Sequence, residues 1–132
     1  MRRHVIFRLT RVALLMVCGA VPLTCDTSTE PAKPGWLGVT LQTPNSDDGA
    51  VLFSVAGGLI DSVRSSFPNA FAKQIGEQSW RVIVAGTVTA GRVAEIWVPD
   101  VNAEGYTATI EQIAVRGSYV QRATTGYGLT IE

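Results

Sequence analysis

Histidine and cysteine are nearly absent from this 132-residue sequence, which has one His and two Cys. All three residues, His4, Cys18 and Cys25, lie within the first 25 positions, so residues 26–132 contain no imidazole and no thiol. Catalysis by a Ser-His-acid or Cys-His set is therefore excluded for that part of the chain, as is a zinc site built from Cys and His. A disulfide within it is excluded as well, so its stability has to come from packing.

Acidic residues are missing from the first 25 positions, which hold four Arg. Residues 26–132 instead hold seven basic and eleven acidic residues, a net charge of −4. A negative net charge without a basic cluster argues against nucleic acid as a partner. The sequence also lacks a glycine-rich phosphate loop ending in Lys-Ser or Lys-Thr. At 46% apolar residues, the chain is apolar enough for one folded domain.

The start of the chain has the pattern of a secretory signal peptide. Residues 1–11 are basic, residues 12–23 are apolar, and Cys25 follows almost at once. A basic segment before a short apolar stretch is how such signals are built. The apolar stretch is 12 residues long, whereas a helix needs roughly 20 to span a bilayer. We therefore expect residues 1–24 to be a signal peptide and the protein to be exported.

Cys25 is followed by a polar stretch with two prolines, and this arrangement resembles a bacterial lipoprotein precursor. The resemblance implies that Cys25 becomes the acylated first residue, that residues 25–35 form a flexible tether, and that the lipid anchors the protein to a cell-envelope membrane. That family prefers Leu three positions before the Cys and a small residue directly before it, whereas this chain has Pro22 and Thr24. Cleavage after Ala20 is the alternative, and it would release a soluble periplasmic or secreted protein.

The remainder of the chain is patterned as β-strands. Apolar and polar residues alternate in short runs, as they do for Val51, Phe53 and Val55, and glycine-containing polar turns separate the runs. This pattern predicts an all-β fold, an antiparallel β-sandwich of seven to nine strands over residues 36–132. The expected strands cover residues 36–42, 50–56, 80–88, 92–98, 106–115, 118–122 and 127–131, with an edge strand at 59–63.

Residues 69–75 depart from this pattern and favour one short helix. Asn69 can cap a helix, Phe71 and Ile75 are spaced to share one helical face, and Gly76 can end it. We expect this helix to cover an open end of the sandwich.

Two tryptophans are the candidate binding residues. Trp36 has the opposite parity to the apolar residues of its strand, and Trp97 shares a face with Val93 and Glu95. Both indoles are expected to point outward, where they could stack on a sugar ring or anchor a protein partner. The alternative is that each packs beneath a neighbouring side chain.

Asp100, Asn102, Glu104 and Glu111 nearly match the spacing of an EF-hand calcium loop, which makes them candidate metal ligands. Glu104 replaces the usual Asp or Asn, and both flanking segments are strand-like, whereas the EF-hand loop joins two helices. The alternative is a polar turn in which Gly105 takes a positive φ. Apart from this Ca²⁺ site, the sequence suggests no cofactor.

Carboxylates are the remaining candidates for acid–base catalysis, as in glycoside hydrolases. Nothing in their spacing selects a pair, and acidic side chains are mostly solvated, so we expect no catalytic residue and no enzyme. The eight carboxylates considered are Asp47, Asp48, Asp61, Glu77, Glu95, Asp100, Glu104 and Glu111.

Short stretches of the domain resemble known proteins. PGWL, DDGAVLF and VAGTVTAG, at residues 34–37, 47–53 and 84–91, resemble small exported bacterial lipoproteins. The order of the strands containing LFSV, IDSV and RVIV is similar to that of cohesin-type sandwiches, surface modules that bind proteins or, in relatives of the fold, carbohydrate. The resemblance implies an immunoglobulin-like or cohesin-like sandwich, but it carries over no binding residue.

These observations predict a membrane-anchored lipoprotein of the cell envelope that acts as a non-catalytic binding or scaffolding module. Its expected partners are the membrane, through the lipid, and an envelope protein or glycan. A small carboxylate-dependent envelope enzyme, such as a glycan hydrolase, is the main alternative. A subunit of a larger envelope complex is a third.

Overall fold

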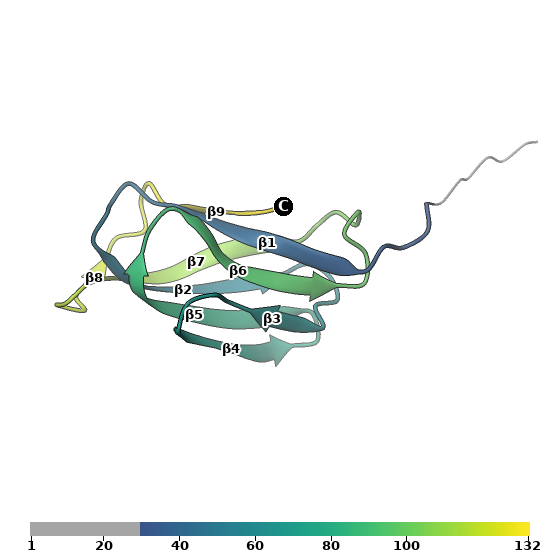
Figure 1. The fold of residues 1–132 in the computed structure, drawn as a ribbon, viewed down its shortest axis with the longest axis horizontal. Helices are drawn as coiled ribbons and strands as arrows, with labels where there is room; N and C mark the ends of the chain where they lie inside the picture. Colours follow the sequence, from purple (N-terminus) through teal and green to yellow (C-terminus); the bar gives the residue numbers. More distant parts are fainter. Residues whose placement is uncertain (1–29) are drawn as a thin grey trace, which may run out of the picture.

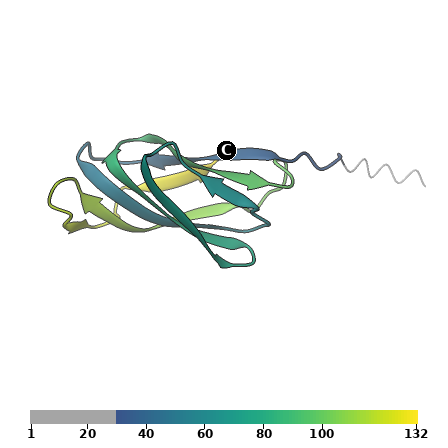
Figure 2. The same cartoon turned by 60° about the horizontal axis from the view of Figure 1, so that its bottom comes forward.

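The computed structural model describes residues 30–132, so the expected signal peptide (residues 1–24) and Cys25 lie outside the described residues. Within that range the protein is all-β, as predicted, and two antiparallel sheets pack face to face (Figures 1 and 2). The strands are β1 (Gly35–Gln42), β2 (Asp48–Ala56), β3 (Ser62–Arg64), β4 (Asn69–Gly76), β5 (Ser79–Val88), β6 (Gly91–Val98), β7 (Thr107–Val115), β8 (Gln121–Arg122) and β9 (Gly128–Ile131).

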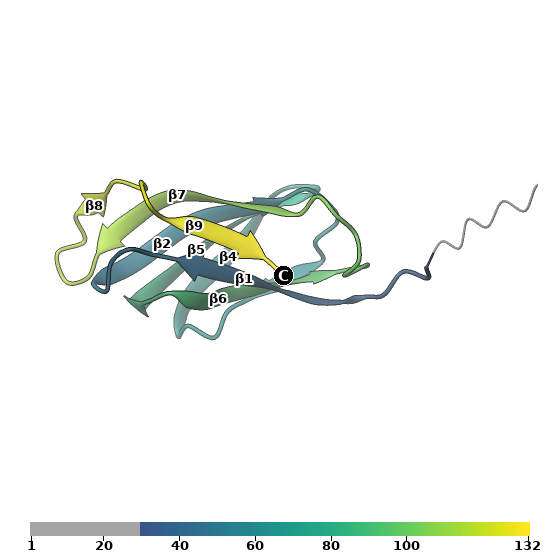
Figure 3. The ribbon, with the colours of Figure 1, turned by 90° about the horizontal axis from the view of Figure 1, so that it is seen from above.

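The four-stranded sheet has the order β3-β6-β1-β9, and the five-stranded sheet has the order β4-β5-β2-β7-β8. Seen from above, β9, β1 and β6 lie across the strands of the other sheet (Figure 3). The edges are therefore β3 and β9 in one sheet and β4 and β8 in the other. Residues 30–34 lead into β1, which lies between β6 and β9.

The core lies between the inner faces of the two sheets. Val51, Phe53 and Val55 alternate along β2 and are fully buried, as their spacing predicts. Val39 and Leu41 of β1 belong to the same buried cluster and come from the opposite sheet. Burying side chains of this kind contributes about 1.5–3 kcal/mol each, so this layer stabilises the domain without a disulfide.

The predicted helix at residues 69–75 is wrong. The segment forms β4, which pairs antiparallel with β5 through a tight turn. Phe71 and Ile75 are four positions apart, and that spacing also puts two residues on the same face of a strand. Hairpin pairing with β5 decides between the two structures. Residues 30–132 contain no helix that could cross a membrane.

Val93 also departs from expectation, because it is buried with Ala94 and does not share the outer face with Trp97. The pairing of β1 with β6 shifts register between Val39 and Thr40, which leaves Val93 as an extra residue in β6. Such a bulge reverses the alternation of faces at one point. Counting alternate residues back from Trp97 therefore gives the correct face of the sheet only as far as this bulge.

Candidate functional site

The two candidate tryptophans lie directly opposite each other on the outer face of the four-stranded sheet. Trp36 of β1 pairs with Trp97 of β6, and their ring centroids are 5.2 Å apart in an edge-to-face arrangement. The guanidinium of Arg64 lies 3.8 Å from the centroid of the Trp36 ring. Both indoles are half-buried, and one face of Trp36 is already covered by a cation.

Charged side chains close the rest of this surface. Arg64 Nε donates to Glu95 Oε2 at 2.6 Å, and Arg92 Nη1 donates to Glu95 Oε1 at 3.4 Å. Arg92 also lies over Gly38, where an added Cβ would be 2.6 Å from its Nε atom. We call Trp36, Trp97, Arg64, Arg92 and Glu95 the indole face. Its members contact one another, so it leaves few groups in need of a partner.

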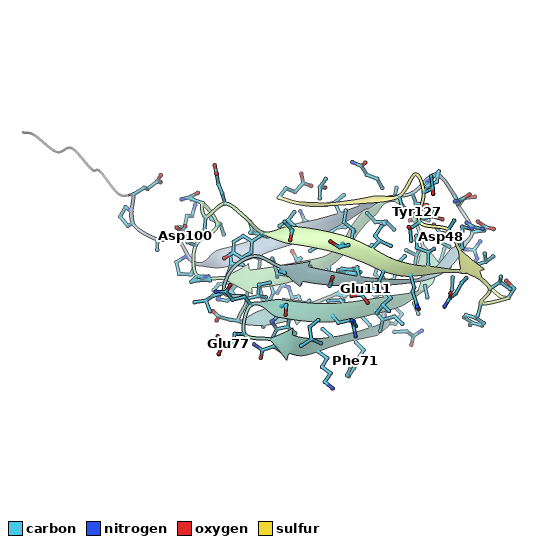
Figure 4. All side chains as sticks on the ribbon, turned by 180° about the vertical axis from the view of Figure 1, so that it is seen from behind. Asp48, Phe71, Glu77, Asp100, Glu111 and Tyr127 are labelled. Carbon is cyan, nitrogen blue, oxygen red and sulfur yellow. The ribbon has the colours of Figure 1, made fainter. Side chains whose placement is uncertain are left out.

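The outer face of the five-stranded sheet is different. Phe71, Ile83 and Leu52 form one row across β4, β5 and β2. Phe71 lies on β4 at the border of the sheet (Figure 4), and its exposed fraction is 65%. Ile75 lies next to this row, further along β4. Tyr119, which is 71% exposed, borders the row at the turn between β7 and β8. We call these five residues the apolar face. Contiguous exposed apolar surface on a small domain commonly marks an interaction site.

Sequence reasoning missed the apolar face because it assigned Phe71 and Ile75 to a covering helix. The available signal was the even spacing of Asn69, Phe71, Lys73 and Ile75 just before a turn and another strand. No such signal existed for the contribution of Tyr119, which comes from a distant turn.

Tyr119 takes an unusual backbone conformation, with φ at 56°. Its N–H donates to the Val115 carbonyl at 2.9 Å, and the Val115 N–H donates to the Val120 carbonyl at 2.9 Å, so the turn is held in place. A non-glycine residue in this left-handed region costs roughly 1–2 kcal/mol. The turn therefore presents an exposed phenol at some cost in stability.

A buried polar cluster closes one end of the sandwich. Asp48 is completely buried, so its predicted solvated role is wrong. Its Oδ1 atom accepts hydrogen bonds from the Tyr127 hydroxyl at 2.7 Å and from Arg122 Nη1 at 2.9 Å, and its Oδ2 atom accepts one from the Thr43 hydroxyl at 2.6 Å (Figure 4). This carboxylate joins the start of β2 to β8 and to the segment before β9.

Asp47, the neighbour of Asp48, is bound to the same cation. Arg122 donates to both of its carboxylate oxygens, at 2.8 and 2.9 Å. The hydrogen bond from Arg122, with the charges of Arg122 and Arg116, holds the pKa of Asp47 below its usual value despite some desolvation. Asp47 is therefore ionised near neutral pH and cannot serve there as a general acid.

The predicted calcium ligands are not brought together. Asp100 accepts hydrogen bonds from the backbone N–H groups of Lys33 and Asn102, at 3.2 and 3.0 Å. Glu111 lies in the middle of β7, away from Asp100, and forms an ion pair with Arg81 at 3.0 Å (Figure 4). Among residues 30–132 there is no group of three or more His, Cys, Asp or Glu side chains placed to hold a metal ion.

The segment around Glu104 is a polar turn between β6 and β7. Gly105 has a φ of 100°, which is the positive value that the turn interpretation requires. Its carbonyl oxygen is so close to Gly57 that a Cβ there would lie 1.9 Å away. Glycine at position 57 thus allows the loop after β2 and the loop before β7 to pack together.

The side chains of the indole face contact one another, whereas those of the apolar face are exposed to solvent. The apolar face is therefore the stronger candidate site. It offers apolar side chains to a partner, with the cations Lys73 and Arg81 beside them.

Comparison of the chain with protein-family models, with curated proteins and with solved structures finds no match.

Proposed function

We propose that the protein is a non-catalytic binding module of the bacterial cell envelope, and that the apolar face binds a partner protein there. The observation that carries this proposal is the exposure of Phe71, Ile83 and Tyr119 on one sheet face. Leaving such side chains in water has no benefit for folding, since burial would stabilise each of them. We also propose an immunoglobulin-like or cohesin-like type for the sandwich, supported by its two facing antiparallel sheets.

Site-specific cross-linking in intact cells tests the binding surface. A photoreactive phenylalanine analogue replaces Phe71 or Ile83 in turn, and the matched control replaces Thr40, on the other sheet. We expect the same cross-linked partner from positions 71 and 83 and none from position 40. Equal cross-linking from all three positions, or none from any, would rule out the apolar face.

The proposed anchor is Cys25, with residues 25–35 as the tether. Its support is the basic and apolar start of the chain and the polar stretch that follows. The intact mass of the exported protein separates an acylated start at Cys25 from an unmodified start at Val21. A Cys25→Ala variant is expected to move from the membrane fraction to the soluble fraction.

The indole face is the competing binding surface, and its natural ligand class is a glycan, because indoles stack on sugar rings. Trp36→Ala and Trp97→Ala variants, compared with the unmodified protein on a glycan array, test it. Binding that both variants retain would exclude the indole face.

A further inference from the structure

Nothing within residues 30–132 pairs with the outer edge of β4. β4 is the last strand of its sheet, and no backbone hydrogen bond from the rest of residues 30–132 reaches that edge. Its pairing with β5 is regular from Asn69 to Gln74 and shifts register only after Gln74. Long edge strands with exposed apolar residues readily pair with another strand, and proteins usually cover or interrupt them.

The charges beside this edge are unbalanced. Lys73 of β4 lies directly opposite Arg81 of β5, and like charges in that position destabilise a strand pair. Arg81 is compensated by Glu111, with an Nε–Oε2 distance of 3.0 Å. Lys73 takes part in none of the ion pairs found among residues 30–132. A carboxylate on a strand added outside β4 would lie opposite Lys73 and balance its charge, as Glu111 balances that of Arg81.

The inner side of the same edge has room for a side chain. A hollow of about 280 Å³ lies between the edges of the two sheets. Its lining is mixed, with Arg64 and Ser65 on one side and mostly apolar residues elsewhere, namely Val63, Phe67, Ala70, Phe71, Ala72 and Val82. Ala70 and Ala72 pair with the buried residues Val84 and Val82 of β5, so they face the inner side of the sheet, and their small size leaves the space open. An apolar side chain from the inner face of an added strand would enter this hollow on the side lined by Ala72 and Val82.

Two other occupants fit this edge less well. Inserting β4 into a membrane would place its unpaired N–H and C=O groups in hydrocarbon, where each costs several kcal/mol. Pairing with the β4 strand of a second copy would add a second Lys73 to the same sheet face, and β4 contains no carboxylate to offset either cation.

We propose that the edge of β4 binds an extended segment of the partner protein as an additional strand. That segment carries an acidic side chain opposite Lys73, an apolar one opposite Phe71, and an inward-facing apolar one beside Ala72. This proposal rests on the proposed function, because it takes the five-stranded sheet to be the binding surface. Backbone pairing supplies affinity, and the alternate side chains supply specificity.

Selection from a library of displayed eight-residue peptides against the purified exported protein tests the proposal. We expect enrichment of peptides in which an acidic residue adjoins two consecutive apolar residues, and protection from hydrogen exchange along residues 69–76 when they bind. A Lys73→Glu variant should weaken those peptides about tenfold and favour lysine at the acidic position. Lys33→Glu makes the same change of charge away from β4 and should leave binding unchanged.

Methylation of peptide backbone nitrogens tests the strand pairing itself. Methyl groups on the amides that face β4 should abolish binding, whereas methyl groups on the alternate amides should not. Equal effects from both sets, no enrichment of any peptide, or a selection unaffected by Lys73→Glu would overturn the proposal.

The two rejected occupants have their own signatures. Self-association of the protein that protects β4, or binding to anionic vesicles that Lys73→Glu removes, would also overturn the proposal. Cross-links from positions 71 and 83 in cells, found together with a failed peptide selection, would leave the proposed function standing and discard only the added strand.

Discussion

The two outer faces of the sandwich both carry aromatic residues, but they differ in how far those residues are exposed to solvent. On the indole face, large aromatic rings contact each other and a guanidinium, and Glu95 bonds two arginines. On the apolar face, Phe71 and Tyr119 remain largely in solvent. The contrast teaches that the size of an aromatic residue does not by itself mark a binding surface. The side chains around it decide whether it stays available.

The largest loss of stability is expected at the buried Asp48 cluster, which connects the two sheets. Both outer faces depend on this connection, because each face exists only while the sheets stay packed together. Asp48→Ala removes an acceptor from Arg122, Tyr127 and Thr43 in a buried place. We expect a loss of about 3 kcal/mol in the free energy of unfolding, measured by urea titration. Asp47→Ala is the matched control, and since the Asp47 side chain is 52% exposed its loss should be clearly smaller. Equal losses would contradict the structural role of Asp48.

A pair of aromatic substitutions compares the faces directly. Trp97→Ala removes a half-buried ring and its contact with Trp36, so we expect it to cost about 2 kcal/mol of stability. Phe71→Ser removes a ring that is 65% exposed and should change stability by no more than about 0.5 kcal/mol. Thermal unfolding of both variants measures the difference. A larger loss for Phe71→Ser would mean that the apolar face supports the fold.

A pair of arginines sharpens the comparison, since Arg64 and Arg81 are 54% and 51% exposed and each bonds one glutamate. Arg64 also covers Trp36, whereas Arg81 has no such ring contact among residues 30–132. We expect Arg64→Ala to cost about 1 kcal/mol and Arg81→Ala about 0.3 kcal/mol. Chemical denaturation at low and high salt reports both values, and similar losses would show that the ring contact adds nothing.

The smallest effect concerns pH. Because Arg122 holds the pKa of Asp47 below its usual 3.8, the folded state favours the ionised carboxylate. This contribution to stability is fully present above the unfolded-state pKa, near pH 4, and is lost as pH falls through the lower folded-state pKa. Asp47→Asn should therefore weaken the dependence of the urea midpoint on pH below about 4. An unchanged dependence would assign the acid sensitivity to other carboxylates.

Much of the fold follows from local pattern. The period of two along β2 placed Val51, Phe53 and Val55 in the core, because a strand with one buried face allows only one register. The same reasoning failed at Phe71 and Ile75, whose spacing suits both a helix and a strand. There the strand is selected by hydrogen bonding to β5, and the local sequence of residues 69–75 carries no information about that pairing.

The candidate sites were less accessible to sequence reasoning, since they depend on residues that are distant along the chain. Asp48 is the last of four consecutive polar residues before Gly49, and nothing nearby shows that Arg122, 74 positions later, will bond to it. Likewise, parity predicts that Trp36 and Trp97 each point outward, but it does not predict that they pair with each other or that Arg64 covers Trp36.

The position of β1 has a mechanical consequence. It is the first strand after the proposed tether, it lies between β6 and β9, and the Gly38 and Glu132 backbones exchange two hydrogen bonds, at 2.7 and 3.0 Å. A pull on residues 30–34 along the axis of β1 would shear its hydrogen bonds to both neighbours together, where a pull across them would break them one at a time. Forced unfolding is governed by the rate of that rupture, so the hydrogen bonds to both neighbouring strands set the force at which the domain would unfold when pulled from this end.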